Sequence, residues 1–324
     1  MNRWAERPAA RLRVLKPGLF TTVQDLGRFG YQRFGMSVGG AMDRLALRLA
    51  NRLAGNPDQV AALEITVRGP ELAFDDEAVI ALAGADLSPS LDGQPLPNWT
   101  TIRVGPDSTL SFGERRSGAR AYLALAGGID VPLSLGSRST HTRSRTGGLE
   151  GRALVRGDEL RGGMPNPSAW QNVGRSVSVA ARPPCSAGPI LRVVLGPQAD
   201  CFVPEAVERL TAGSYLLSPQ SDRMGYRLAG APLVHAGAAD VISDATPCGS
   251  VQVPASRQPI LLMADCQTTG GYPKIAVVIS ADLPLAAQLV PGDRIKFSIV
   301  TIPEARAALR TQRDELDTAL PPQS

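Results

Sequence analysis

Apolar residues between positions 42 and 53 recur with the period of an α-helix. Spaced i, i+3, i+4, i+7, i+8 and i+11 on one helical face, they are Met42, Leu45, Ala46, Leu49, Ala50 and Leu53. The sequence Gly55-Asn56-Pro57 predicts the end of this helix. A second helix is predicted to open at Pro303-Glu304 and to run through Leu316, because proline is favoured in the first helical turn.

Most other apolar segments are short and flanked by turn residues, which favours β-strands. In residues 294–299 (RIKFSI) polar and apolar positions alternate, and this predicts a strand that is buried on one side. The run 260–263 (ILLM) is apolar throughout and predicts burial on both sides. The predicted strands are 12–15, 79–83, 100–104, 121–126, 191–195, 260–264, 275–280 and 294–300. With 33 Gly and 27 Pro spread along the chain, the pattern predicts a mainly β fold with few helices.

Two pairs of similar segments favour two related lobes. Residues 154–160 (LVRGDEL) resemble 289–295 (LVPGDRI), and 27–31 (GRFGY) resembles 222–226 (DRMGY). A chain of 324 residues is also longer than one hydrophobic core usually serves. The predicted division is an N-terminal extension (1–10), a β-rich lobe with one helix (11–163), a linker (164–189), a second lobe (190–300), and a C-terminal helix and tail (301–324). Both lobes are expected to be β-barrel-like.

Composition and charge narrow the class of protein. With 43% hydrophobic and 20% charged residues the chain is globular rather than disordered. Its longest apolar stretch, 275–290, is interrupted by Asp282 and Pro284, and the N-terminus lacks a signal-like apolar core, so we expect a cytoplasmic protein without a membrane partner. The net charge of +4 arises from 34 basic residues interleaved with 30 acidic ones, so no nucleic-acid partner is expected.

Residues for metal or nucleophilic chemistry are few. The four cysteines lack the paired spacing of disulfides or zinc sites, so reduced thiols and no bound metal are expected. They are Cys185, Cys201, Cys248 and Cys266. His141 and His235 are the candidate bases for a serine triad, but each is better explained as a loop or strand-end residue.

Residues 264–274 (ADCQTTGGYPK) place more polar groups in a connection between two predicted strands than a turn requires. Gly270-Gly271 allows positive φ and close backbone approach, so amides could converge on an anion. Lys274 would supply the positive charge. Lysine is rare in this chain, where the others are Lys16 and Lys296. The candidate residues here are Asp265, Gln267, Thr268, Thr269, Gly270, Gly271, Tyr272 and Lys274. The alternative is a Gly-Gly turn with solvent-facing side chains, and the absence of a Walker A motif excludes a P-loop.

Two further sites are suggested in the C-terminal half. Asp222 and Arg223 are adjacent and could orient one another to bind a carboxylate or amide, or could form a surface ion pair. Gln252 lies among apolar residues, where a buried amide needs partners, so a structural and a ligand role are both open.

The N-terminal half offers four polar candidates near glycine turns. Gln24, Asp25 and Arg28 could face a cleft, and their spacing alone leaves their role undecided. Asp43 stands near the start of the predicted helix, so helix capping is its simplest explanation.

Together these segments resemble the biotin-dependent carboxyltransferase family, also called allophanate hydrolase subunit 2, over roughly residues 12–297. The motifs are 20–31 (FTTVQDLGRFGY), 40–43 (GAMD), 126–130 (AGGID), 135–140 (LGSRST), 147–154 (GGLEGRAL), 221–226 (SDRMGY), 251–254 (VQVP) and 267–274 (QTTGGYPK). Arg145 departs from the pattern, which has an apolar residue before the Gly pair. The resemblance implies two cyclophilin-like β-barrel lobes.

The resemblance implies three possible functions. A separate chain of this length is most similar to the C-type subunit of 5-oxoprolinase, which opens 5-oxo-L-proline to L-glutamate with ATP and acts beside a B-type subunit, with an A-type subunit as a further candidate partner. The second is a carboxyltransferase subunit that moves a carboxyl group between biotin and a urea-like amide. The third is a non-catalytic Kip-type regulatory protein that binds a partner.

The resemblance and the chemistry together give the candidate residues roles. For a 5-oxoprolinase the cofactor is ATP, with Mg²⁺ through the complex, and biotin belongs to the second function alone. Lys274, Asp222 and Arg223 are the catalytic candidates, with Lys274 and the Gly pair contacting phosphate or an oxyanion. The remaining candidates, of which Gln252 would recognise the amide, are assigned to substrate binding.

Overall fold

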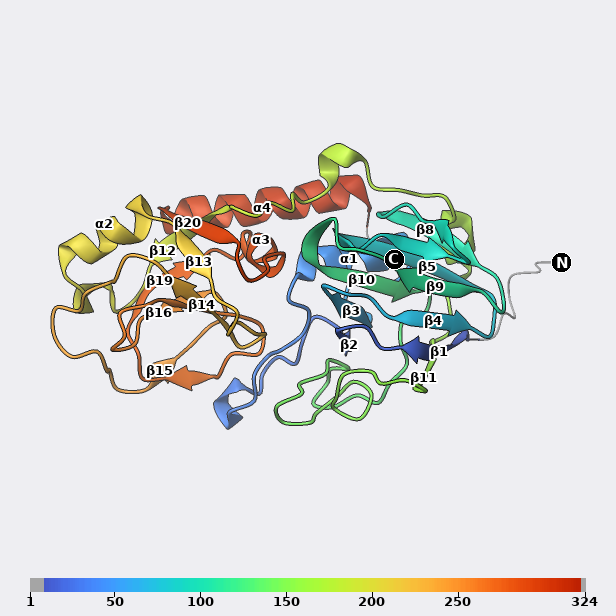
Figure 1. Ribbon diagram of the computed structural model, residues 1–324, viewed down its shortest axis with the longest axis horizontal. Coiled ribbons are helices and arrows are strands. Elements are labelled where there is room, and N and C mark those ends of the chain that lie inside the picture. The colour runs from blue at the N-terminus through green and yellow to red at the C-terminus, as the bar shows by residue number, and fades with distance from the viewer. Residues whose placement is uncertain (1–8, 322–324) are drawn as a thin grey trace. The chain divides into compact units, whose positions relative to one another are not determined.

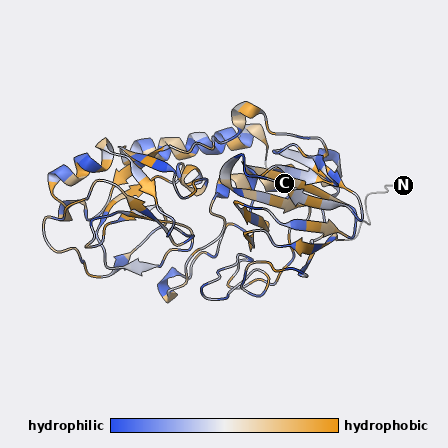
Figure 2. Cartoon of the chain, in the orientation of Figure 1, coloured by the Kyte–Doolittle hydropathy of each residue, from blue (hydrophilic) through white to orange (hydrophobic). Residues whose placement is uncertain are grey.

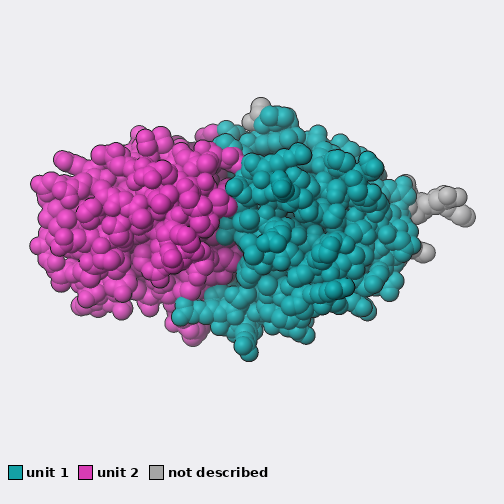
Figure 3. Space-filling view, viewed as in Figure 1, with its two compact units in different colours: residues 1–28, 43–184, 315–324 teal, residues 29–42, 185–314 magenta. Residues whose placement is uncertain are grey.

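The structure is a computed structural model that describes residues 9–321, so most of the predicted extension 1–10 and the last residues of the tail lie outside the described residues. The chain forms two compact units, shown in different colours in Figure 3. Unit 1 contains residues 1–28, 43–184 and 315–324, and unit 2 contains 29–42 and 185–314. The boundary at 184/185 falls inside the predicted linker, whereas residues 29–42 group with unit 2 rather than with the N-terminal lobe.

Unit 1 is built from two antiparallel sheets (Figure 1). The six-stranded sheet has the order β11 (Glu159–Arg161), β1 (Arg11–Lys16), β4 (Glu71–Phe74), β9 (Thr109–Phe112), β6 (Pro89–Leu91) and β7 (Gln94–Pro95). The five-stranded sheet has the order β2 (Phe20–Gln24), β3 (Ala62–Thr66), β10 (Ser117–Leu125), β5 (Ala78–Asp86) and β8 (Thr100–Val104). Side chains from both sheets, such as Leu72 and Leu123, share one buried core. The ladders therefore form two sheets around a core, rather than one closed barrel.

Helix α1 (Arg44–Leu53) packs against β5 and β10 through its apolar face. Leu49, Ala50 and Leu53 are fully or almost fully buried, as the helical spacing predicted. Asp43 is the N-cap residue, and its Oδ1 accepts a hydrogen bond from the Ala46 N–H at 2.9 Å. The capping explanation for Asp43 is confirmed.

Unit 2 contains a closed seven-stranded barrel. Its order is β12 (Ile190–Leu195), β19 (Lys274–Val278), β16 (Ser250–Gln252), β17 (Ile260–Leu262), β14 (Gly225–Ala229), β13 (Tyr215–Leu217) and β20 (Arg294–Ile299). Strands β12 and β20 pair in parallel and close the ring, and the other pairs are antiparallel. Residues such as Val193, Leu261 and Phe297 fill the interior. Strands β15 (Asp244–Ala245) and β18 (Thr269–Gly270) form a separate two-stranded ladder.

Three further helices belong to the C-terminal half of the sequence. They are α2 (Pro204–Ala212), α3 (Leu283–Ala287) and α4 (Ile302–Ala319), and short 3-10 turns lie at Gln32–Phe34, Pro167–Asn172, Val179–Ala181 and Ala199–Cys201. Polar colours recur along α4 in Figure 2, in agreement with Leu316 being its only buried residue among those described. The Arg52 guanidinium fixes the end of this segment within unit 1, donating to the Leu320 carbonyl and to Asp317, each at 2.7 Å.

The mainly β fold predicted from the sequence is confirmed, as are both helices and all eight predicted strands, with boundary shifts of a few residues. The alternation in β20 gives the expected alternating burial. Several two- to five-residue strands and helices α2 and α3 were not predicted, because segments this short carry little periodicity.

One of the two predicted internal similarities is structural. Gly157 and Gly292 both have positive φ, at 91° and 98°, and each precedes an aspartate that leads into a strand. Asp158 Oδ2 accepts from the Val155 N–H at 2.8 Å, and Asp293 Oδ2 accepts from the Val290 N–H at 2.9 Å. The second similarity is not structural, since Gly225 begins a strand while residues 27–31 lie outside any strand.

The four cysteines are free thiols. Among residues 9–321, no three His, Cys, Asp or Glu side chains cluster in a way that could hold a metal ion. None of the described helices is both long enough and apolar enough to cross a membrane.

Candidate functional site

The polar segment 264–274 is paired with another part of unit 2. Its residues Thr269–Gly270 form β18, which pairs with β15. The carbonyls of Thr268 and Gly271 accept hydrogen bonds from the backbone N–H groups of Thr246 and Val241, at 3.0 and 2.8 Å. Neither glycine has positive φ, so this part of the prediction is wrong. The segment is one side of a short ladder and not an open cradle of amides.

Lys274, the first residue of β19, is buried to 2% exposure. Its Nζ donates to Asp244 Oδ2 at 2.7 Å and to the Ala245 carbonyl at 2.8 Å. Gln198 Nε2 donates to the same Asp244 oxygen at 3.1 Å. The hydrogen bond from Lys274 is the main cause that lowers the pKa of the Asp244 carboxyl. The ammonium therefore holds an anion that the chain itself supplies, and Lys274 is not a solvated turn residue.

Gln252 is buried on β16, and its amide is bonded at both ends. Its Nε2 donates to the Tyr272 carbonyl at 3.1 Å, and its Oε1 accepts from Gln267 Nε2 at 3.2 Å. A Cβ at position 270 would lie 2.8 Å from Gln252 Nε2, so a larger residue there would force the Gln252 amide to shift. The predicted close approach is therefore observed, and in this structure it serves a glutamine pair inside the chain.

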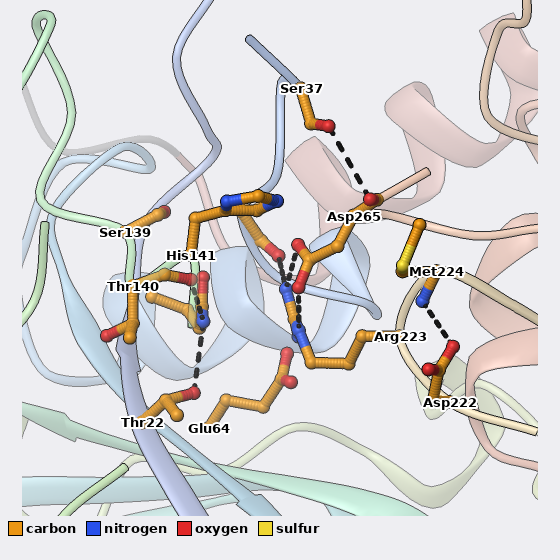
Figure 4. Close-up of polar contacts among 12 residues, drawn as sticks. Thr22, Ser37, Glu64, Ser139, Thr140, His141, Asp222, Arg223, Met224 and Asp265 are labelled. Atoms are coloured by element: carbon orange, nitrogen blue, oxygen red, sulfur yellow. Dashed lines mark hydrogen bonds and ion pairs between the residues drawn. The ribbon is translucent and has the colours of Figure 1, made fainter. Parts of the chain in front are cut away.

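A buried ion pair joins Arg223 to Asp265, two of the predicted residues (Figure 4). Arg223 Nε donates to Asp265 Oδ2 at 2.8 Å and its Nη2 to Oδ1 at 3.0 Å, a bidentate arrangement. The same Nη2 donates to the Gly40 carbonyl at 2.6 Å, and Ser37 Oγ donates to the Cys266 carbonyl at 2.6 Å. Through these contacts the segment 37–40 is fastened to the 264–266 segment.

Asp222 does not pair with its neighbour Arg223. It is exposed, and its Oδ1 accepts from the backbone N–H groups of Met224 and Gly225 at 2.8 and 3.2 Å, which forms a local turn (Figure 4). The expectation that Asp222 and Arg223 orient one another is therefore wrong, because the arginine finds its carboxylate on Asp265.

In unit 1, Asp25 organises the loop 137–140. Its carboxylate accepts from the Gly27 N–H at 2.8 Å, from Ser137 Oγ at 2.7 Å, from the Arg138 N–H at 2.6 Å, and from Ser139 Oγ. Arg28, 1% exposed, donates to the Ser139 carbonyl. Asp25 and Arg28 thus fasten this loop to the end of β2.

Gln24 lies at the end of β2 and is fully buried. Its Nε2 donates to Thr22 Oγ1 at 3.0 Å and to the Thr140 carbonyl at 3.1 Å, while its Oε1 has no hydrogen-bond partner. His141 is the next residue after Thr140, and its Nδ1 lies 2.7 Å from Ser144 Oγ. Of the predicted N-terminal residues, Gln24 is the one that presents an unused acceptor.

A buried polar chain that the prediction missed runs through Glu64, Tyr122 and Asp43. The Asp43 N–H donates to Tyr122 Oη at 2.8 Å, and Tyr122 Oη donates to Glu64 Oε2 at 2.7 Å. Burial, followed by the charges of Glu64 and Asp43, raises the pKa of Tyr122 well above its ordinary value. The signal in the sequence was a glutamate inside the apolar strand 62–66 (ALEIT), which only a polar partner explains.

The structure therefore gathers the predicted residues into separate groups within each unit. In unit 1 they are Gln24, Asp25 and Arg28 around the 137–140 loop, with Asp43 at the start of α1. In unit 2, Arg223 and Asp265 form one group, and Gln252, Gln267, Thr268, Thr269, Gly270, Gly271, Tyr272 and Lys274 line or neighbour the β15–β18 ladder. Gln198 and Asp244 complete the second group, and no spacing along the chain indicates either residue.

The family model for the carboxyltransferase domain, subdomain A and B, matches residues 34–299. The chain belongs to this family. It is 39% identical to the C-type subunit of 5-oxoprolinase from Haemophilus influenzae, over 91% of this chain and 93% of that protein. The corresponding Escherichia coli protein is 38% identical, over 93% of this chain and 95% of the relative.

A solved structure, the K. lactis urea amidolyase, is also similar, with a TM-score of 0.88 and 32% identity. The match covers 97% of this chain but 20% of that one. The similarity thus extends through both units of this chain, and it corresponds to one region of a much longer protein.

Proposed function

We propose that this chain is a subunit of an ATP-dependent 5-oxoprolinase and acts together with a B-type partner subunit. The observation that supports it is the 38–39% identity to two 5-oxoprolinase C subunits over nearly the full length of both compared chains. The term subunit in those names implies a complex, and an A-type subunit is a further candidate partner.

The reaction converts 5-oxo-L-proline, ATP and water to L-glutamate, ADP and phosphate. A lactam carbonyl is a poor electrophile, and phosphorylation of its oxygen by the γ-phosphoryl group releases ADP and gives a better one. Two waters complete the hydrolysis. The first adds to that carbon, the C–N bond breaks and the nitrogen takes up a proton, and the second cleaves the resulting acyl phosphate to the carboxylate and free phosphate. Charge develops on oxygen in both steps, so the site needs fixed hydrogen-bond donors.

The geometry separates the candidate residues by the roles they can take. Arg223 and Asp265 already satisfy one another, so we propose that they position the 37–40 segment rather than bind substrate. Gln252 is likewise proposed to position the β18 backbone. Lys274 is the group suited to an anionic ligand, since its ammonium is buried while its partner Asp244 is half exposed.

We propose that ATP is bound by the assembled complex rather than by this chain alone. The test is to purify the chain alone and together with its B-type and A-type subunits, and to measure 5-oxoproline-dependent formation of ADP and glutamate. Activity is expected only in the assembly. Robust 5-oxoproline-dependent ATP hydrolysis by the isolated chain would contradict the subunit role, and an inactive full assembly would contradict the reaction.

A second function is favoured by the urea amidolyase structure, which matches 97% of the chain. In that case the chain would move a carboxyl group from N-carboxybiotin to a urea-like amide, releasing biotin. Transfer of labelled carboxyl from carboxybiotin to urea distinguishes the two functions, because the 5-oxoprolinase reaction neither needs biotin nor transfers a carboxyl group.

A further inference from the structure

Residues 236–248 of unit 2 form a segment with almost no buried apolar surface. Within this fully described segment Thr246 is the buried side chain, and Ile242 is 94% exposed. The segment begins with AGAA at 236–239, small residues that contribute little packing. What holds the segment in place must therefore be polar contacts.

The backbone contacts of this segment are few. Strand β15 pairs with β18 over two residues, and Val241 and Thr246 donate one N–H each to the 268–271 backbone. Thr246 Oγ1 also donates to the Gln267 carbonyl at 2.5 Å. A two-stranded ladder of this length is marginal by itself.

The Ala236 N–H also donates to the Cys201 carbonyl at 2.9 Å, Cys266 Sγ donates to the Thr246 carbonyl at 3.6 Å, and Lys274 Nζ donates to the Ala245 carbonyl at 2.8 Å. A further contact is ionic, and its two halves differ in exposure. The Lys274 side chain is 2% exposed, at the start of a barrel strand, whereas the Asp244 side chain is 50% exposed on the segment. Lys274 Nζ and Gln198 Nε2 converge on the same oxygen, Asp244 Oδ2. A buried ammonium requires an anion, but that anion need not be Asp244.

We propose that Lys274 and Gln198 form a binding site for the carboxylate or phosphate group of a ligand, and that Asp244 occupies this site until the ligand displaces it and releases segment 236–248. In the exchange one anionic oxygen replaces another as the partner of the buried ammonium, so the ammonium stays paired. The freed Asp244 carboxylate returns to water, where it is already half hydrated. The proposal deepens the role proposed above for Lys274, because it adds the second donor, the internal group that is displaced and the segment that is released. Its tests use contacts inside unit 2 and inorganic anions, so they do not depend on the proposed reaction.

The first experiment measures thermal stability as a function of inorganic phosphate, with chloride at equal ionic strength as the reference. Asp244→Ala removes the internal carboxylate from the site. Because a ligand that binds the folded state stabilises the protein, this variant should be stabilised by phosphate at about a tenfold lower phosphate concentration than the unaltered chain. Acetate in place of phosphate tells which anion the site prefers.

Two variants control this measurement. Glu71→Ala removes the carboxylate partner of Lys16, a lysine that is 75% exposed, and should show no phosphate dependence beyond the unaltered chain. Asp244→Ala combined with Lys274→Gln should lose the gain. If Asp244→Ala gains no stabilisation from either anion, or if the gain survives Lys274→Gln, the proposal is wrong.

The second experiment follows hydrogen exchange in peptides that cover 236–248. Exchange should accelerate in Asp244→Ala, and phosphate should accelerate it in the unaltered chain, while peptides that cover β12 stay protected as an internal control. Unchanged exchange in 236–248 under both conditions would overturn the release of the segment, even if anion binding is found.

Discussion

Removing the carboxylate of Asp265 should destabilise unit 2 strongly. Arg223 and Asp265 have side chains 8% and 7% exposed, so Asp265→Ala removes the bidentate partner of a buried guanidinium. Breaking such a pair from one side costs about 3–5 kcal/mol. For a domain of this size that corresponds to a decrease in the thermal midpoint of about 6–20 °C.

Thermal unfolding of Asp265→Ala measures this effect, and exchange of the Gly39 N–H reports on the 37–40 segment, since that group donates to the Ala264 carbonyl. The control is Asp76→Ala, which removes the partner of Arg11, 57% exposed, and should cost about 0–1 kcal/mol. Arg223→Met combined with Asp265→Leu removes both charges and should cost less than Asp265→Ala. A loss in Asp265→Ala no larger than in Asp76→Ala, or a double variant as unstable as the single one, would refute the reasoning.

Four further predictions follow from the described contacts. Tyr122→Phe should cost about 1–3 kcal/mol of unfolding free energy, because it removes the hydroxyl that accepts from the buried Asp43 N–H and donates to the buried Glu64 Oε2. Tyr215→Phe, whose hydroxyl contacts are 3.4 and 3.5 Å long, should cost less in the same urea titration. Burial raises the pKa of the Cys266 thiol to about 12 from an ordinary 9.0. The thiol should therefore resist thiol reagents in the native protein at pH 8, and it should react together with the other three cysteines after denaturation. Its contribution to stability is complete below pH 9.0 and is lost as the pH rises toward about 12. Hydrogen bonds from Arg152 lower the pKa of Asp158 below its ordinary 3.8. The contribution of Asp158 to the free energy of unfolding is therefore complete above pH 3.8 and is lost on further acidification. Asp158→Asn should flatten the acid limb of a curve of stability against pH. In the assembled complex Lys274→Ala should reduce turnover by about 10²–10³-fold, by analogy with lost oxyanion donors, while Lys296→Ala, at an exposed position, should leave turnover unchanged.

The secondary structure that could be predicted from the sequence followed from local patterns of apolar and polar residues. Helix α1 and strand β20 follow from periodicities of 3.6 and 2, which depend only on which face of an element meets the core. The sequence also predicted the capping role of Asp43 and the two Gly-Asp turns at 157–158 and 292–293. These features are local, because their hydrogen bonds join residues three positions apart.

The pairing of charged and polar side chains was decided by the tertiary structure alone. Arg223 pairs with Asp265, 42 residues later, and not with its neighbour Asp222; Lys274 pairs with Asp244, 30 residues earlier. These partners meet because of strand order and register in unit 2, and the spacing along one chain does not encode either. The same holds for residues 29–42, which lie within the N-terminal third of the sequence but pack with unit 2, since Gly40 and Ser37 find their hydrogen-bond partners at 223 and 266.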